Sequence, residues 1–326
     1  LSKVVFSSTI TTLPANLFQG DTSLTDITLP KSITSVVTDS GSSTTTGEGY
    51  SAFYGSSLET IDMSAITSYV VSTTTSLTTT VPAYLFTGLT TLKNVVLKTG
   101  TTAIGNYAFQ NTSGLVYVKE ASQSTTSGYT TTGTLTTIGN YAFAGSGLSS
   151  FTATATTAVD GTAPGFVLNE GAFQDTTSLT TVDLSNATNL TTIPSFAFRN
   201  STGLKTITLP EPTTSGSLTL GESAFYGVTN LTAIDFSKFS SLTINTSNFV
   251  NANALATIDL SGLTSIPTFI SDSSITTFTG LPSTAVVKLS SAINAIANST
   301  VFTQIKADSA TTYTRVALEY PNGLTF

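Results

Sequence analysis

The chain has 326 residues, of which 39% are hydrophobic and only 9% are charged, and its formal net charge is −7. This apolar content is sufficient for a buried core, while the scattered Lys and Arg residues form no basic stripe, so nucleic acid is not expected as a partner. Cysteine and histidine are both absent, which excludes Cys nucleophiles, Ser catalysis with a His base, and zinc sites built from His or Cys.

The first residues, LSKVVF at 1–6, resemble LKNVVL at 92–97. We therefore expect the sequence to begin inside a repeating unit, on a strand, with an exposed apolar end. Leu1, Val4 and Phe6 are the candidate docking residues at this end. Three explanations of this end are open: upstream residues were removed, a cap lies outside the chain, or another subunit docks here. The absence of an initiator Met and of a signal-type segment favours a removed or omitted part.

From Leu13 onward the chain repeats one pattern, in which an Ala-Phe or similar pair is followed by a polar turn and then by Leu-x-x-Ile-x-Leu, often with Pro. The clearest copies begin at Leu13, Val81, Leu168, Ile193 and Leu220. The anchor residues are Phe18, Phe53, Phe86, Phe109, Phe143, Phe173, Phe198, Phe225 and Phe249. Their spacing of about 23 to 35 residues is typical of solenoids and indicates roughly ten coils.

Each unit contains the alternation of a half-buried strand. In LKTITLP, Ile207 and Leu209 share one face while Thr206 and Thr208 face the other side. A shorter extended segment such as LTTI at 190–193 precedes the Phe-bearing corner, which we expect to be partly helical. Because one coil cannot bury its own apolar edge, successive coils must stack as parallel ladders with the phenylalanines in a file. The file is interpreted as core rather than as an aromatic binding groove.

Three segments rich in Ser, Thr and Gly interrupt the repeat at 38–49, 120–134 and 211–217. We expect them to be surface loops on one edge, serving as spacers, recognition loops or O-glycosylation tracts.

The repeat is predicted to form one solenoid domain over 1–282. Residues 283–326 depart from it and are predicted to be a degenerate last repeat, a C-terminal cap or a docking segment. Docking between unlike ends is heterologous and would build an open filament.

The outward position of the strand carries Asp62, Asp183, Asp235 and Asp259 in some coils and Thr in others. The candidate binding face consists of Asp183, Thr206, Thr208, Asp235, Thr257 and Asp259. Asp235 and Asp259 should lie roughly 5 Å apart, where a Ca²⁺ ion could bridge them, but two carboxylates are few ligands for calcium, and a solvated ladder that discourages aggregation is the favoured interpretation. The repeat predicts no cleft for a glycosidase-type carboxylate pair, so we expect no enzyme, cofactor or resident metal. The Thr rows are interrupted, which disfavours an ice-binding surface.

The units resemble the BspA-like branch of the leucine-rich repeats, whose pattern I-x-x-x-A-F-x-x-x-x-x-L-x-x-I-x-L-P is matched by Ile193 to Pro210. The resemblance extends from Leu13 to about Pro282 and implies a β-rich solenoid, a right-handed superhelix with parallel β-ladders and short helical corners. It also implies a non-catalytic extracellular or cell-surface protein that mediates adhesion by binding a protein or glycan. The alternative is a structural subunit that assembles head to tail, with copies of itself as partners, into an extracellular filament or surface layer. No segment approaches the roughly 20 apolar residues of a membrane span.

Overall fold

The computed structural model describes residues 4–7, 9–33, 35–38, 51–71, 77–154, 165–212, 216–265, 267–269, 281–282, 284–289 and 317–319. The chain divides into two compact units, Leu1–Phe173 and Gln174–Phe326. In the described part of each unit the regular structure consists of β-strands, and no helix is present.

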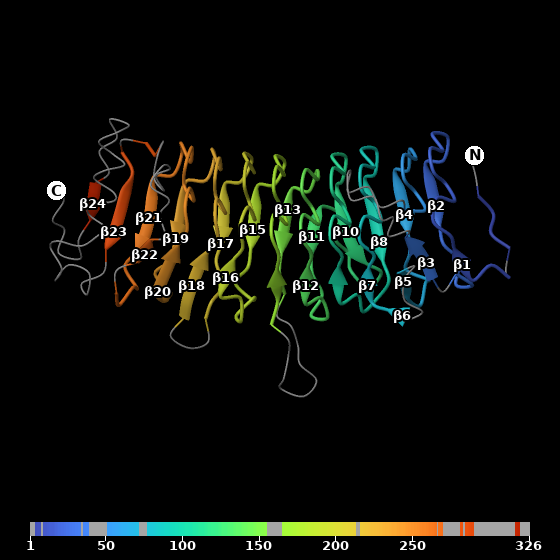
Figure 1. Ribbon diagram of the computed structural model, residues 1–326, viewed down its shortest axis with the longest axis horizontal. Coiled ribbons are helices and arrows are strands. Elements are labelled where there is room, and N and C mark those ends of the chain that lie inside the picture. The colour runs from blue at the N-terminus through green and yellow to red at the C-terminus, as the bar shows by residue number, and fades with distance from the viewer. Residues whose placement is uncertain are drawn as a thin grey trace. The chain divides into compact units, whose positions relative to one another are not determined.

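In unit 1, one sheet contains the strands that end each Leu-x-x-Ile-x-Leu segment, here called closing strands (Figure 1). They pair in parallel in the order β2 (Asp26–Thr28), β4 (Thr60–Asp62), β8 (Asn94–Leu97), β10 (Tyr117–Glu120), β11 (Gly128–Thr130) and β13 (Ser150–Thr152). A second parallel sheet contains β7 (Thr80–Val81), β9 (Ala103–Ile104), β12 (Thr137–Ile138) and β14 (Val167–Leu168). A third contains β1 (Thr12–Leu13), β3 (Ser35–Thr38) and β5 (Tyr69–Val71), with β6 (Leu77–Thr78) added antiparallel to β5.

In unit 2, the closing strands are β15 (Thr181–Asp183), β17 (Thr206–Thr208), β19 (Ala233–Asp235), β21 (Thr257–Leu260), β23 (Val286–Leu289) and β24 (Ala317–Glu319). Parallel pairing joins β15 to β17, and it joins β19, β21, β23 and β24 in that order. The other sheet of unit 2 is also parallel and contains β16 (Thr192–Ile193), β18 (Gly216–Leu220), β20 (Phe239–Ile244) and β22 (Thr268–Phe269). Strands β23 and β24 continue the ladder beyond residue 282. The domain boundary expected at this residue stays a prediction.

The phenylalanine file predicted from the repeat is confirmed within each unit. The six anchor rings of unit 1 follow one another with centroids 4.9, 5.5, 6.0 or 6.1 Å apart, from Phe18 to Phe173. In unit 2, Phe198 stacks on Phe225 at 5.5 Å and Phe225 on Phe249 at 5.9 Å. All nine anchors are buried. The rings are therefore core, and each coil supplies the apolar surface that covers its neighbour.

The expected helical corners are not present in the described residues, because two left-handed residues flank the anchor phenylalanine. Around Phe86 these are Tyr84, with φ of 61°, and Gly88, with φ of 74°, and a right-handed helix cannot include such residues. The corner instead bonds to the next coil: the N–H groups of Tyr84, Phe86 and Gly88 donate to the carbonyls of Asn106, Ala108 and Gln110 at 2.8–3.0 Å. The corner is thus a hydrogen-bonded turn that forms a further ladder along the solenoid.

The prediction that 120–134 is a surface loop is wrong. Residues 128–130 form β11, which pairs in parallel with β10 and β13. The Tyr129 ring is buried and lies 5.8 Å from the Phe143 ring and 6.0 Å from that of Phe151. Ser and Thr dominate this segment, but the Tyr129 side chain points into the core, and the segment is therefore a buried strand. Of the other predicted loops, 38–49 lies outside the described residues except for Thr38, the last residue of β3, and 211–217 includes the start of β18.

Candidate functional site

The closing strands of unit 2 bring together the predicted binding-face residues in pairs. Asp183 lies opposite Thr208 and Thr181 opposite Thr206 in the β15–β17 pair. Asp235 lies opposite Asp259 and Ala233 opposite Thr257 in the β19–β21 pair. All six predicted residues, Asp183, Thr206, Thr208, Asp235, Thr257 and Asp259, are exposed or half-buried.

The aspartate side chains of this face accept hydrogen bonds from the main chain. In each of Asp183, Asp235 and Asp259, Oδ1 accepts a hydrogen bond of 2.7–2.9 Å from the N–H of the serine two residues later. This Asx-type turn directs the chain away from the strand. The signal was present in the sequence as Asp-x-Ser after each of these strands, and the prediction of a purely solvated ladder did not use it.

The three carboxylates differ in their charged neighbours. Asp259 Oδ2 lies 3.8 Å from Lys288 Nζ on the adjacent strand β23. Asp235 forms no ion pair with a described residue, and its Oδ2 has no hydrogen-bond partner among them. No group of three or more His, Cys, Asp or Glu residues in the described ranges could hold a metal ion. Asp235 is therefore the carboxylate of this pair whose charge is not offset by a lysine.

The ladder of unit 2 is interrupted between β17 and β19. Within the described residues of this unit, no strand pairing or main-chain hydrogen bond joins these two strands, although they belong to successive coils. The equivalent residues around the next junction do bond: Phe236 N–H donates to the Asp259 carbonyl at 2.8 Å, and Thr257 N–H donates to that of Thr232 at 3.2 Å. Ile207, the middle residue of β17, is correspondingly only half-buried, whereas Ile234 and Ile258 are buried.

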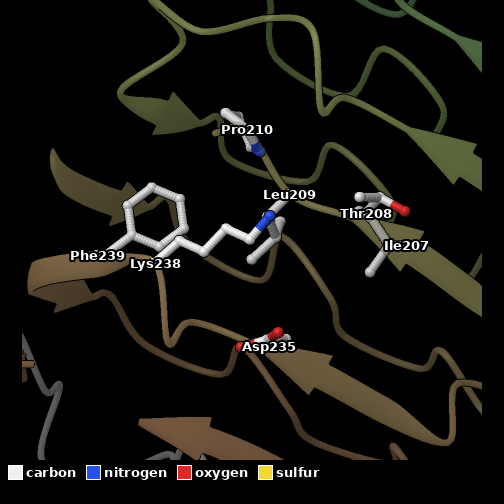
Figure 2. A pocket seen from close by; sticks show the side chains of 7 residues that line it. All are labelled: Ile207, Thr208, Leu209, Pro210, Asp235, Lys238 and Phe239. Carbon is white, nitrogen blue, oxygen red and sulfur yellow. The ribbon is translucent and has the colours of Figure 1, made fainter. Parts of the chain in front are cut away.

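A pocket of about 200 Å³ lies at this interruption (Figure 2). Its lining residues are Ile207, Thr208, Leu209, Pro210, Asp235, Lys238 and Phe239. Figure 2 shows Asp235 on the side of the pocket opposite Pro210. The Lys238 ammonium is paired with Glu211, so the pocket combines apolar walls with one carboxylate that lacks a cation.

Local sequence differences accompany the interruption. After β17 the Asp-x-Ser turn is replaced by Thr208-Leu209-Pro210, and proline has no N–H to donate. In the following coil, Phe239 occupies the turn position that Ala187 and Leu263 occupy in their coils, since each donates its N–H to the residue three earlier. The larger ring and the lost donor distinguish this junction from the β19–β21 junction. Sequence reasoning treated Pro210 as a normal repeat ending and missed the pocket.

The predicted end-docking residues are described only in part. Leu1 lies outside the described residues. Val4 and Phe6 are half-buried, and the Phe6 ring packs edge-on against Phe18 with centroids 6.4 Å apart. The predicted closing strand is wrong for residues 4–7, which contain no strand, because Phe6 extends the aromatic file instead of pairing with β2.

Comparisons with known proteins agree with this architecture. The model of the BspA-type leucine-rich repeat region matches residues 1–131 and 167–293 with six copies. A leucine-rich repeat protein from Bacteroides ovatus is similar in structure, with a TM-score of 0.50 and 17% identity over 90% of this chain and 73% of that chain. A leucine-rich repeat protein from Eubacterium ventriosum gives a TM-score of 0.40 and 19% identity over 83% and 80% of the two chains. The pneumococcal vaccine antigen PcpA gives 0.28 and 18% over 90% and 78%.

The likeness to the Bacteroides ovatus protein, at 17% identity, concerns the fold alone. No curated protein matches the chain. Within the described residues, no helix has the length and apolar character needed to span a bilayer. The family model covers most of the chain and agrees with the parallel ladders and the phenylalanine file. The chain therefore belongs to the BspA-type leucine-rich repeat family, a family of typically non-catalytic binding proteins.

Proposed function

We propose that this chain is a non-catalytic extracellular or cell-surface protein that binds a protein or glycan partner through the closing-strand face of unit 2. The observation that supports this proposal is the interruption between β17 and β19, which creates a pocket in an otherwise continuous ladder. A concave apolar site with a few polar groups is the usual form of a binding site. The exposed Thr206 lies on β17 and the half-buried Asp259 on β21, and both would contact the partner around the pocket.

The test fills the pocket without disturbing the core. Thr208 is exposed and lines the pocket, so Thr208→Phe should occupy the space while the variant still folds. The matched control is Thr28→Phe, at the equivalent exposed position of β2 in unit 1. Both variants and the natural chain would be screened on protein and glycan arrays and then titrated against the partners found.

We expect Thr208→Phe to weaken partner binding by about tenfold or more, as happens when a central contact is lost, and Thr28→Phe to leave it unchanged. Equal binding by all three proteins would contradict the proposal. Circular dichroism would verify that both variants are folded.

The head-to-tail filament stays an alternative. Exposed apolar side chains near the first described coil, Val5, Ile10 and Leu17, favour self-association. Light scattering after size-exclusion chromatography of the purified chain decides between the two: a monomer at high concentration opposes the filament, whereas end-to-end rods in the electron microscope oppose a purely monomeric binding module.

A further inference from the structure

We propose that the pocket between β17 and β19 receives a lysine side chain from a partner protein. This inference rests on the proposed binding function and specifies it, because it selects a protein partner and names the group that enters the pocket.

The pocket offers one carboxylate oxygen as a hydrogen-bond acceptor. Asp235 Oδ1 is used by the Ser237 N–H, while Oδ2 has no partner among the described residues. The nearest equivalent carboxylate, Asp259, already has Lys288 within 3.8 Å. A cation entering this pocket would therefore find an uncompensated negative charge, in a chain whose net charge is −7.

A second acceptor follows from the register of β17. Thr206 N–H donates to the Thr180 carbonyl, and the Thr208 carbonyl accepts from the Leu184 N–H, so both threonines direct their main-chain groups toward β15. In a parallel ladder the residue between them points to the opposite side. The Ile207 carbonyl thus faces the interruption, where β19 is not paired with it.

The walls of the pocket are small and largely apolar. Leu209 and Phe239 are buried apolar residues, and Pro210 completes this side of the pocket (Figure 2). A pocket of about 200 Å³ is smaller than the sites of roughly 300 Å³ and above that take drug-sized ligands. A single side chain with an apolar stem and a compact charged end fits these features.

Lysine has both properties. Its four methylene groups would pack against the apolar walls, and its ammonium group has three donors and no acceptor. The Asp235 carboxylate and the Ile207 carbonyl would accept two of those donors, leaving the third for water. The chain's own Lys238 does not supply this cation, because its ammonium is paired with Glu211.

The test uses Nα-acetyl-L-lysine-N-methylamide as the probe, titrated into the full chain and followed by NMR. The matched probe is the Nε-acetylated form, which keeps the stem and loses the charge. Asp235→Asn is the test variant, because the Asn side chain retains an oxygen for the Ser237 N–H and so preserves the turn. Asp62→Asn makes the same change on β4 in unit 1, where Asp62 Oδ1 likewise accepts a hydrogen bond from the N–H of the serine two residues later, and is the control.

We expect the lysine probe to bind and shift the signals of residues around Ile207, and we expect Nε-acetylation or Asp235→Asn to weaken binding about tenfold, as for other charge-assisted contacts. Asp62→Asn should have little effect. The inference is overturned if the acetylated probe binds equally well, if Asp62→Asn is as damaging as Asp235→Asn, or if no probe binds.

The outcomes also separate this inference from the proposed function. If a macromolecular partner binds and the binding depends on Thr208, but the lysine probe does not bind, the function stands and the inference fails. If the probe binds at Asp235 but no macromolecule binds the chain, the assignment of the pocket to a lysine side chain stands, whereas the partner protein and the proposed function fail.

Discussion

At the scale of single residues, burial decides which polar groups are costly. The Tyr129 hydroxyl is buried and has no hydrogen-bond partner among the described residues. Burial raises the pKa of Tyr129 well above its ordinary value, and the nearby charge of Glu120 adds to this shift. Burial raises the pKa of Tyr69 as well, although Thr101 and the Lys98 main chain interact with its hydroxyl. An unpaired buried hydroxyl is a net cost to folding.

We therefore predict that Tyr129→Phe is neutral or raises the free energy of unfolding by about 1 kcal/mol. Urea denaturation at neutral pH would measure this difference. Tyr69→Phe is the comparison, because it removes a hydroxyl that has partners, and it should lower stability. A clear loss of stability in Tyr129→Phe would show that its hydroxyl has a bonding role.

The same substitution should change the response to alkaline pH. Below pH of about 10 tyrosine is protonated in both states, so the buried rings add no pH dependence. Above it the unfolded chain releases protons that the folded chain retains, so stability falls as pH rises from about 10 toward the raised pKa values of the folded state. Tyr129→Phe should reduce this alkaline loss, which denaturation curves at several pH values would record.

At the scale of the structural elements, close contact between coils restricts the residues at the corners. A Cβ atom on Gly139 would lie 2.7 Å from the main-chain nitrogen of Asn106 in the preceding coil. Gly88 is a glycine for another reason, since its φ is 74° and its Cβ direction is open. Asn111 and Asn200, with φ of 57° and 55°, occupy the same place after their anchor phenylalanines. Gly139 is therefore required by the packing of the coils, whereas Gly88 is required by its backbone conformation.

These two causes predict different effects of substitution. Gly139→Ala should lower the free energy of unfolding by about 1–3 kcal/mol, because main-chain atoms cannot move away as a flexible side chain can. Gly88→Asn should cost less than about 1 kcal/mol, since asparagine tolerates the left-handed region. Thermal and urea denaturation of both variants would test this order, and a reversed order would contradict the packing argument.

At the scale of the whole molecule, stability depends on apolar burial rather than on charge. Charged residues make up 9% of the chain. The ion pairs of the described residues join half-exposed side chains, as in Lys93–Glu59, where 50% and 43% of the side-chain surfaces are exposed. Exposed pairs of this kind contribute little to stability.

We accordingly predict that the melting temperature changes by less than about 3 °C between about 20 mM and about 500 mM NaCl, because salt screens interactions that are already weak. Scanning calorimetry at the two salt concentrations would measure the change. A larger decrease in high salt would reveal an ionic contribution that the described pairs do not explain. By contrast, the lysine probe should bind more weakly in high salt, since its contact with Asp235 is electrostatic.

The sequence by itself determined the repeat, the buried positions and the family, because each coil must present the same apolar edge to its neighbour. The nine phenylalanines could be identified from spacing alone for this reason. The turn made by Asp235 could also have been found, from the serine two residues later. The left-handed corners were not predicted. Tyrosine and phenylalanine rarely adopt a positive φ, so Tyr84 and Phe196 do not indicate this conformation as a glycine would.

Only the tertiary structure decided that β17 and β19 do not pair, and this determined where the pocket lies. Pairing depends on whether the main chains of two successive coils approach within hydrogen-bonding distance. Pro210 alone does not decide this, because the same Thr-Leu-Pro ending follows β2 at Thr28 to Pro30, and β2 still pairs with β4. A periodic pattern describes what the coils share, whereas the candidate site arises where one junction differs from the rest.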